Sequence, residues 1–157
     1  MPDVEVRPAT SKSDVAAVKA LFLDYLQFVT DYLGQDLSFQ GTEKEFANFP
    51  TTYTRLFLAR HGENAVGAVG LKLLRPNLLE LKRLYVSPEG RGLNLGKRLS
   101  QAAINEARML GYTELYLDTD PGLAHANAIY EVLGFQDVEQ YYENPLGSQS
   151  RYMRLAL

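Results

Sequence analysis

The sequence predicts one α/β domain, in which a mixed sheet of six or seven strands carries helices on both faces. Two observations lead to this fold class. Short segments rich in β-branched and aromatic residues alternate along the chain with longer segments whose apolar residues recur at helical spacing. The 157 residues also have the length of a single domain, without an internal repeat, linker or low-complexity segment. We therefore expect residues 1–157 to form one domain.

The first third of the chain contains one strand and two helices. Residues 4–7 alternate between apolar and polar side chains and predict a short strand. Residues 13–33 predict a long amphipathic helix that ends at Gly34. Thr42 and Glu45 have the spacing of a capping box for a short helix that Pro50 stops. The expected inward residues of the long helix are Val15, Val18, Phe22, Tyr25, Leu26 and Val29.

The rest of the chain continues the alternation. Two strands, at 56–59 and 65–74, are expected to form a hairpin, and a third strand ends at Val86 before Ser87-Pro88. A helix with apolar residues at helical spacing starts near Leu95. The remaining elements are expected to be a strand at 115–118, a helix around Asn127, and two strands near 136–140 and 151–157.

The segment from Leu79 to Leu99 joins a strand to a helix through a turn with two glycines. Such a turn directs several backbone N–H groups and a helix N-terminus toward one point, which is a geometry that binds phosphate. A kinase-type loop is excluded because Gly96-Lys97-Arg98 lacks the hydroxyl residue that holds magnesium. A dinucleotide turn is excluded because the glycine spacing differs by one residue.

A second pattern runs from Asn127 to Phe135. Asn127 and Tyr130 are three residues apart and so share one face of a helix. Gly134 stands where a left-handed helix cap belongs, and Phe135 begins the next strand. On its own, Tyr130 is more typical of an aromatic side chain packed under a sheet.

These two patterns, in this order, resemble the GCN5-related N-acetyltransferase (GNAT) superfamily. Its acetyl-CoA loop reads Arg/Gln-x-x-Gly-x-Gly/Ala, and Arg91, Asn94 and Gly96 occupy the fixed positions. Asn94 departs from the family glycine, and Asn is the non-glycine residue that best tolerates a left-handed conformation. The second family signature is an Asn, a Tyr three residues on, and a helix that ends in Gly-Phe, as at Asn127–Phe135.

The resemblance implies a single-domain GNAT-like fold with a mostly antiparallel sheet, and acetyl-CoA as cosubstrate. In this family two neighbouring strands separate beside the loop, and pantetheine lies between them. Backbone groups at the end of the strand would pair with pantetheine, and loop N–H groups would hold the pyrophosphate. The implied cofactor-binding residues are Leu84, Tyr85, Val86, Arg91, Gly92, Leu93, Asn94, Leu95, Gly96, Lys97, Asn127 and Tyr130.

The resemblance also implies the catalytic groups of an N-acetyltransferase. Tyr130 matches the position of the proton donor to the departing thiolate, and Glu80 lies where several members place a glutamate base. The face on which Glu80 lies depends on strand register, and the alternatives are an exposed strand carboxylate or a partner of Lys82 or Arg83. The amine would attack the thioester directly, since a chain without cysteine cannot form a thioester of its own.

The acceptor amine is the least defined part of the prediction. Two segments are expected to border it, one in the connection after the long helix and one after the Asn127 helix. Aromatic faces together with carboxylates suit a cationic amine on a small molecule or a peptide, although aromatic residues such as these are more often part of a core. The expected substrate-binding residues are Phe39, Gln40, Asp118 and Tyr142.

Composition excludes several other classes of function. A net charge of −3 argues against a nucleic-acid binder, and two isolated histidines without cysteine predict no metal site. We expect neither a membrane span nor a signal peptide, and hence a cytoplasmic protein. The apolar ending at 152–157 could pair with a second copy in a homodimer or close its own sheet. The alternative to an enzyme is a non-catalytic acyl-CoA sensor or interaction module on the same fold.

Overall fold

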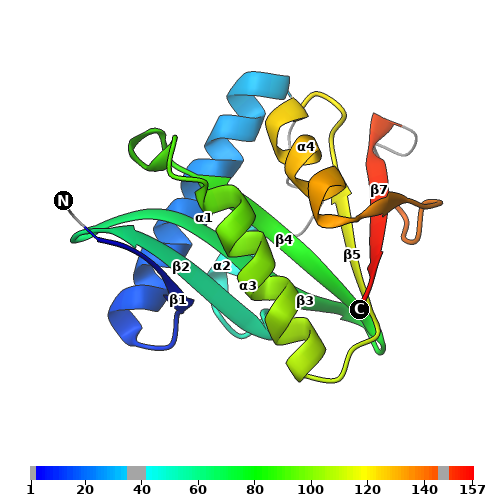
Figure 1. The fold of residues 1–157 in the computed structure, drawn as a ribbon, viewed down its shortest axis with the longest axis horizontal. Coiled ribbons are helices and arrows are strands. Elements are labelled where there is room, and N and C mark those ends of the chain that lie inside the picture. The colour runs from blue at the N-terminus through cyan, green and yellow to red at the C-terminus, as the bar shows by residue number, and fades with distance from the viewer. Residues whose placement is uncertain (1–2, 35–41, 145–148) are drawn as a thin grey trace.

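A computed structural model describes residues 3–34, 42–144 and 149–157 of the chain. Its centre is one seven-stranded sheet in the order β1-β2-β3-β4-β5-β7-β6 (Figure 1). Every pair of neighbouring strands is antiparallel except β4 and β5, which run parallel. The structure therefore confirms the α/β fold class and the mostly antiparallel sheet.

The strands lie close to their predicted positions. The sequence places β-branched and aromatic residues in them and ends them with turn residues such as Gly62 and Ser87-Pro88. The sixth strand is shorter than the predicted segment 136–140. The bounds are β1 Val4–Pro8, β2 Arg55–His61, β3 Asn64–Arg75, β4 Leu78–Val86, β5 Glu114–Thr119, β6 Gln136–Asp137 and β7 Arg151–Ala156.

The helices follow the predicted capping signals with one exception. Two of them end at glycines in the left-handed conformation, Gly34 with φ 66° and Gly134 with φ 101°. Glu45, however, is not the partner in a capping box, because its carboxylate faces the sheet and binds Arg83. The bounds are α1 Lys12–Leu33, α2 Thr42–Ala47, α3 Leu95–Met109 and α4 Ala124–Leu133, with a short 3₁₀ helix at Pro88–Gly90.

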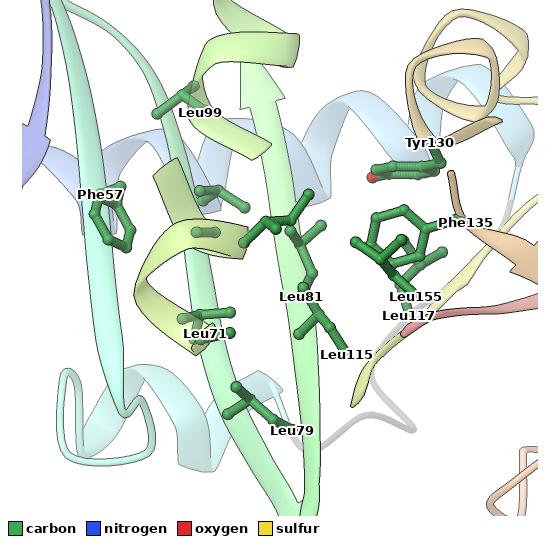
Figure 2. Packing of buried hydrophobic residues seen from close by; sticks show 14 of the residues in the cluster. Phe57, Leu71, Leu79, Leu81, Leu99, Leu115, Leu117, Tyr130, Phe135 and Leu155 are labelled. Carbon is green, nitrogen blue, oxygen red and sulfur yellow. The ribbon is translucent and has the colours of Figure 1, made fainter. Parts of the chain in front are cut away.

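Helices cover both faces of the sheet and bury a separate apolar cluster on each. α1 and α2 lie on one face, where Phe22 of α1 packs with Leu58 and Ala68 of the sheet. α3 and α4 lie on the other face, where Leu99 of α3 belongs to one apolar cluster with Phe57 and Leu71 of the sheet (Figure 2). Along α1 the burial pattern differs from the expectation, since Val15, Tyr25 and Leu26 are only half-buried while Asp14 and Leu21 are buried.

The side-chain alternation of β4 decides which of its residues face which helix. Leu79 and Leu81 belong to the cluster under α3, so Glu80 points to the opposite face, where α1 and α2 lie. Lys72 of β3 is directly opposite Glu80 on that same face. The structure thus places the predicted base on the side of the sheet that carries α2.

The C-terminal strand closes its own sheet. β7 lies between β5 and β6 and pairs with β5 along the whole length from Glu114 to Thr119. The apolar ending is therefore used within the chain, which removes the reason for expecting it at an interface. A homodimer stays a prediction without this support.

Candidate active site

A cavity of about 970 Å³ opens where β4 and β5 stop pairing. In the described part of the chain the two strands pair only at Glu80 and Tyr116, and beyond that position residues of both strands line the cavity. Ligands of open α/β sheets usually bind beyond the carboxyl ends of strands that diverge in this way. The volume is large enough for a substrate together with part of a cofactor.

A bulge in β4 shapes one wall of this cavity. Ala68 is opposite Tyr85 and Gly70 is opposite Lys82, so Arg83 and Leu84 together face the single residue Val69. Arg83 has φ 61°, a left-handed conformation that is unusual for a residue with a long side chain. The extra residue changes the alternation of β4, which turns Leu84 toward the cluster under α3.

The turn between β4 and α3 provides the backbone donors that the sequence predicts. Gly92 has φ 82° and Asn94 has φ 60°, so both lie in the left-handed region, as expected for Asn94. The first helical hydrogen bond runs from Arg98 N to Asn94 O, and no side chain caps the helix at Asn94. The N–H groups of residues 95–97 therefore have no partner within the helix and lie on the cavity wall.

α3 and α4 are in close contact near the N-terminus of α3. A Cβ atom at Gly96 would lie 2.7 Å from Cδ1 of Ile129, so this glycine permits the two helices to approach. Positive side chains stand at the same end, since Arg91 and Lys97 both line the cavity and are exposed. Uncapped N–H groups and cations together form an anion-binding end of the cavity.

Tyr130 of α4, the residue after Ile129, lines the same cavity. Its ring packs against Phe135 with centroids 5.8 Å apart, and the hydroxyl points away from Phe135 toward β4 (Figure 2). The side chain is buried, yet its hydroxyl has no hydrogen-bond partner in the described chain and the residue lines the cavity. Burial raises the pKa of Tyr130, so the phenol keeps its proton at neutral pH.

Asn127 shares the buried face of α4 with Tyr130 but has a different environment. Its Oδ1 accepts a hydrogen bond of 2.9 Å from the hydroxyl of Thr119, and its Nδ2 donates one of 2.9 Å to the carbonyl of Asp120. Asn127 thereby ties the end of β5 to α4, and it does not line the cavity.

Glu80 is almost completely buried, with 1% of its surface exposed. Its carboxylate accepts a 2.6 Å hydrogen bond from the hydroxyl of Tyr141, and the residue does not itself line the cavity. Burial raises the pKa of Glu80 above the ordinary value, while the charge of Lys82 and the Tyr141 hydrogen bond oppose this shift. A carboxylate with a raised pKa is closer to the pH at which a general base works best.

Asp118 and Lys82 form a second polar group, on the two strands that separate. Lys82 Nζ lies 3.6 Å from Asp118 Oδ1, and the hydroxyl of Tyr142 donates a 2.6 Å hydrogen bond to Asp118 Oδ2. Asn144 donates in turn to the Tyr142 hydroxyl at 3.1 Å. Asp118 and Asn144 line the cavity, whereas Tyr142 supports them from behind.

The structure brings most of the predicted site residues to one cavity. Leu93 and Asn127 of the cofactor set and Glu80 and Tyr142 of the catalytic and substrate sets lie outside its lining. Phe39 and Gln40 lie outside the described residues. The remaining predicted residues line it: Leu84, Tyr85, Val86, Arg91, Gly92, Asn94, Leu95, Gly96, Lys97, Asp118 and Tyr130.

Sequence reasoning missed the contribution of α1 to this cavity. Tyr25 and Val29 were expected only as inward core residues, yet both line the cavity, together with Phe28 and Tyr32. The spacing of these residues on one side of a helix was visible in the sequence, but the same spacing is typical of a core stripe. It therefore could not distinguish a binding wall from packing.

The described residues also bear on the expectation of no metal site and no membrane span. Within residues 3–34, 42–144 and 149–157, no group of three or more His, Asp and Glu side chains is placed to hold a metal ion. None of the helices in those ranges is both long and apolar enough to cross a membrane. The cytoplasmic location stays a prediction.

Comparison with known proteins identifies relatives across most of the chain. Residues 19–135 match the model of the acetyltransferase (GNAT) family. An uncharacterized N-acetyltransferase of Schizosaccharomyces pombe is 38% identical over 144 residues, which cover 85% of this chain and 87% of the relative.

Solved structures share the fold at lower sequence identity. An acetyltransferase from Streptococcus agalactiae has a TM-score of 0.77 and 19% identity, with 98% of each chain covered. An acetyltransferase from Salmonella typhimurium, solved with its cofactor acetyl-CoA, has a TM-score of 0.71 and 18% identity over 98% of this chain and 94% of that one.

Proposed function

The chain belongs to the GNAT family of acetyltransferases, and we propose that it transfers the acetyl group of acetyl-CoA to a primary amine by direct attack. Acetyl-CoA supplies the acetyl group in activated form, as a thioester. One observation carries the proposal. The free hydroxyl of Tyr130 and the uncapped N–H groups of α3 line the same cavity, so a proton donor and a phosphate site lie along one ligand path.

The residues present fit this cosubstrate. The N–H groups of residues 95–97, with Arg91 and Lys97, would hold the pyrophosphate. The backbone of β4 beyond Glu80 has no strand partner on the side of β5 in the described chain, so its polar groups are available to pantetheine amides. The Salmonella typhimurium relative binds acetyl-CoA in the same fold, which supports this assignment.

Tyr130 is proposed as the general acid. Its raised pKa keeps the phenol protonated, and no hydrogen bond within the described chain holds the proton elsewhere. When the thioester C–S bond breaks, the hydroxyl donates its proton to the departing sulfur, and the phenolate recovers a proton from the newly formed amide nitrogen. This transfer balances the charge that develops on the thiolate.

Glu80 is proposed as the general base. An amine reaches the enzyme mostly as the ammonium ion and must lose one proton before its lone pair can attack the carbonyl carbon. Glu80 does not line the cavity, so it would accept this proton through a chain of water molecules. The hydrogen bond from Tyr141 holds its carboxyl group in place.

The test is thiol release from acetyl-CoA with a broad panel of amines. Native protein is compared with Tyr130→Phe, and with Tyr112→Phe as a control that removes a phenol hydroxyl outside the cavity. We expect Tyr130→Phe to lower kcat about 100-fold, as for loss of a general acid, with KM for acetyl-CoA within about twofold. The control should behave as native protein.

Two outcomes would contradict the proposal in different ways. Full activity of Tyr130→Phe would remove the general-acid assignment while leaving the transferase intact. Binding of acetyl-CoA, measured by calorimetry, without thiol release from any amine would instead favour the non-catalytic acyl-CoA sensor.

A further inference from the structure

The side of the cavity formed by α1 is a wall of aromatic rings. Tyr25, Phe28 and Tyr32 lie along one side of the helix, and Tyr85 of β4 joins them. The ring centroids of Tyr25 and Tyr85 are 6.0 Å apart, those of Phe28 and Tyr85 are 6.2 Å apart, and those of Phe28 and Tyr32 are 5.4 Å apart. The wall runs without interruption from the β4 bulge to the C-terminal end of α1.

These rings line the cavity, and none of them is fully buried. Tyr32 is 63% exposed and stacks on Phe28 with an interplanar angle of only 13°. Tyr25, Phe28 and Tyr85 are half-buried, while Val29 behind them is 3% exposed and belongs to the core. Aromatic rings that line a cavity offer a surface for the ring of a ligand, because aromatic rings attract one another in offset-stacked or edge-to-face arrangements.

The wall lies apart from the anion-binding end of the cavity. α1 covers the face of the sheet opposite to α3, whose N-terminus provides the uncapped N–H groups. Tyr85 packs with the cluster under α1, whereas its neighbours Leu84 and Val86 pack with the cluster under α3. A ligand against the ring wall would therefore approach the β4 bulge from the side opposite to the phosphates.

Two cationic side chains near the wall are held in ion pairs. Lys82 faces Asp118 at 3.6 Å, and Arg83 binds Glu45 at 2.8 Å. Asp120 Oδ1 accepts a hydrogen bond of 2.7 Å from Gly122 N. Of the described residues that line the cavity, the exposed cations Arg91 and Lys97 stand at the phosphate end. The ring wall thus offers aromatic contact area, and the two cations beside it on β4, Lys82 and Arg83, are already engaged by carboxylates.

From these contacts we infer that the acceptor is a primary amine joined by a short alkyl chain to an aromatic ring. The ring lies against Phe28 and Tyr32, and the amino group reaches the end of β4 at Leu84 and Tyr85. This inference rests on the proposed function and narrows its acceptor from amines in general to arylalkylamines.

The test measures thiol release with four amines. 2-Phenylethylamine and n-hexylamine have similar length and differ in the aromatic ring, and spermidine and lysine carry additional charges. We expect native protein to have at least about tenfold higher kcat/KM for 2-phenylethylamine than for the other three. Phe28→Leu and Tyr32→Leu keep an apolar side chain but remove the ring. Each should raise KM for 2-phenylethylamine about tenfold while leaving KM for acetyl-CoA within twofold.

Leu23→Ala is the matched control, because Leu23 is 46% exposed on the same helix and does not line the cavity. Calorimetry of 2-phenylethylamine binding to the protein saturated with coenzyme A gives a readout without turnover. It should show the same tenfold weakening in Phe28→Leu and Tyr32→Leu, and native affinity in Leu23→Ala.

Three results would overturn the inference. Turnover of hexylamine, spermidine or lysine with no preference for the aromatic amine would reject the acceptor class and leave the transferase standing. A rise in KM for acetyl-CoA in the ring variants, with the aromatic preference unchanged, would assign the wall to the cosubstrate. Absence of thiol release with every amine would reject the proposed function and this inference together.

Discussion

Glu45 of α2 and Arg83 of β4 form a fully buried ion pair, with each side chain 3% exposed. Arg83 Nη2 donates to Glu45 Oε1 at 2.8 Å and Arg83 Nε donates to Oε2 at 3.2 Å, and the hydroxyl of Tyr53 also donates to Oε2. Arg83 is the residue with positive φ in the β4 bulge. The pair therefore ties α2 to the β4 bulge that shapes the cavity.

Replacing Glu45 by alanine should destabilise the protein by about 3–5 kcal/mol, because it leaves the Arg83 guanidinium buried without its partner. The free energy of unfolding in urea measures this loss. Glu43→Ala is the control, since Glu43 is exposed on the same helix and should change the free energy by less than about 0.5 kcal/mol. Equal stability of the two variants would show that the ion pair contributes nothing.

The same ion pair predicts a dependence of stability on acid pH. Burial opposes ionisation of Glu45, but the hydrogen bonds and charge of Arg83 prevail and hold the pKa of Glu45 below its ordinary value. A group with a lowered pKa in the folded state stabilises the fold above its unfolded pKa, about 4.3 for Glu, and loses this effect as the pH falls. The unfolding free energies of native protein and Glu45→Ala should therefore draw closer below pH about 4. A constant difference down to pH 3 would contradict this.

Glu80→Gln should separate activity from stability. The variant keeps an acceptor for the Tyr141 hydroxyl but cannot take a proton, so kcat should fall about 100-fold and the acidic limb of the pH–rate profile should disappear. Burial raises the pKa of Glu80, which means that the ionised form is costly in the folded protein above that pKa. The variant should therefore be at least as stable as native protein at pH 8. An unchanged pH–rate profile would refute the base role.

Asn94 tests the backbone conformation of the phosphate turn. Asn94 has φ 60°, a conformation that glycine adopts without strain, so Asn94→Gly should leave KM for acetyl-CoA equal or lower. Asn94→Val should raise this KM about tenfold, because the left-handed conformation costs a β-branched residue roughly 1–2 kcal/mol. Asn77→Val is the matched control. Asn77 has φ 67° in the turn between β3 and β4 and does not line the cavity, so its variant should lose stability with KM unchanged.

Local signals in the sequence were sufficient for most elements of the fold. The sequence predicts helix ends at Gly34 and Gly134, with Gly134 as a left-handed cap, and it predicts Asn94 as a left-handed turn residue. All three have positive φ. These positions are predictable because the backbone requirement and the residue that meets it occur at the same place in the chain. The alternation of strands and helices follows from side-chain periodicity in the same way.

Contacts between distant segments could not be predicted in this way. Glu45 was placed in a capping box, although its partner Arg83 lies 38 residues away and only the tertiary fold brings them together. The bulge at Arg83 carries no glycine or asparagine that would indicate positive φ. The link from Tyr141 to Glu80 spans 61 residues, so the buried position of the predicted base was equally hidden.

The single pairing position between β4 and β5 has a consequence for the apo protein. β1 to β4 and the group of β5, β7 and β6 share one sheet, yet the backbone joins them only at Glu80 and Tyr116 in the described chain. A cosubstrate bound between β4 and β5 would provide hydrogen-bond partners for backbone groups that the sheet leaves unpaired. Its binding would therefore join the two parts of the sheet. Saturation at 100 times Kd would then add about 2.7 kcal/mol to the free energy of unfolding, with the slowing of amide hydrogen exchange concentrated in β5 and the end of β4.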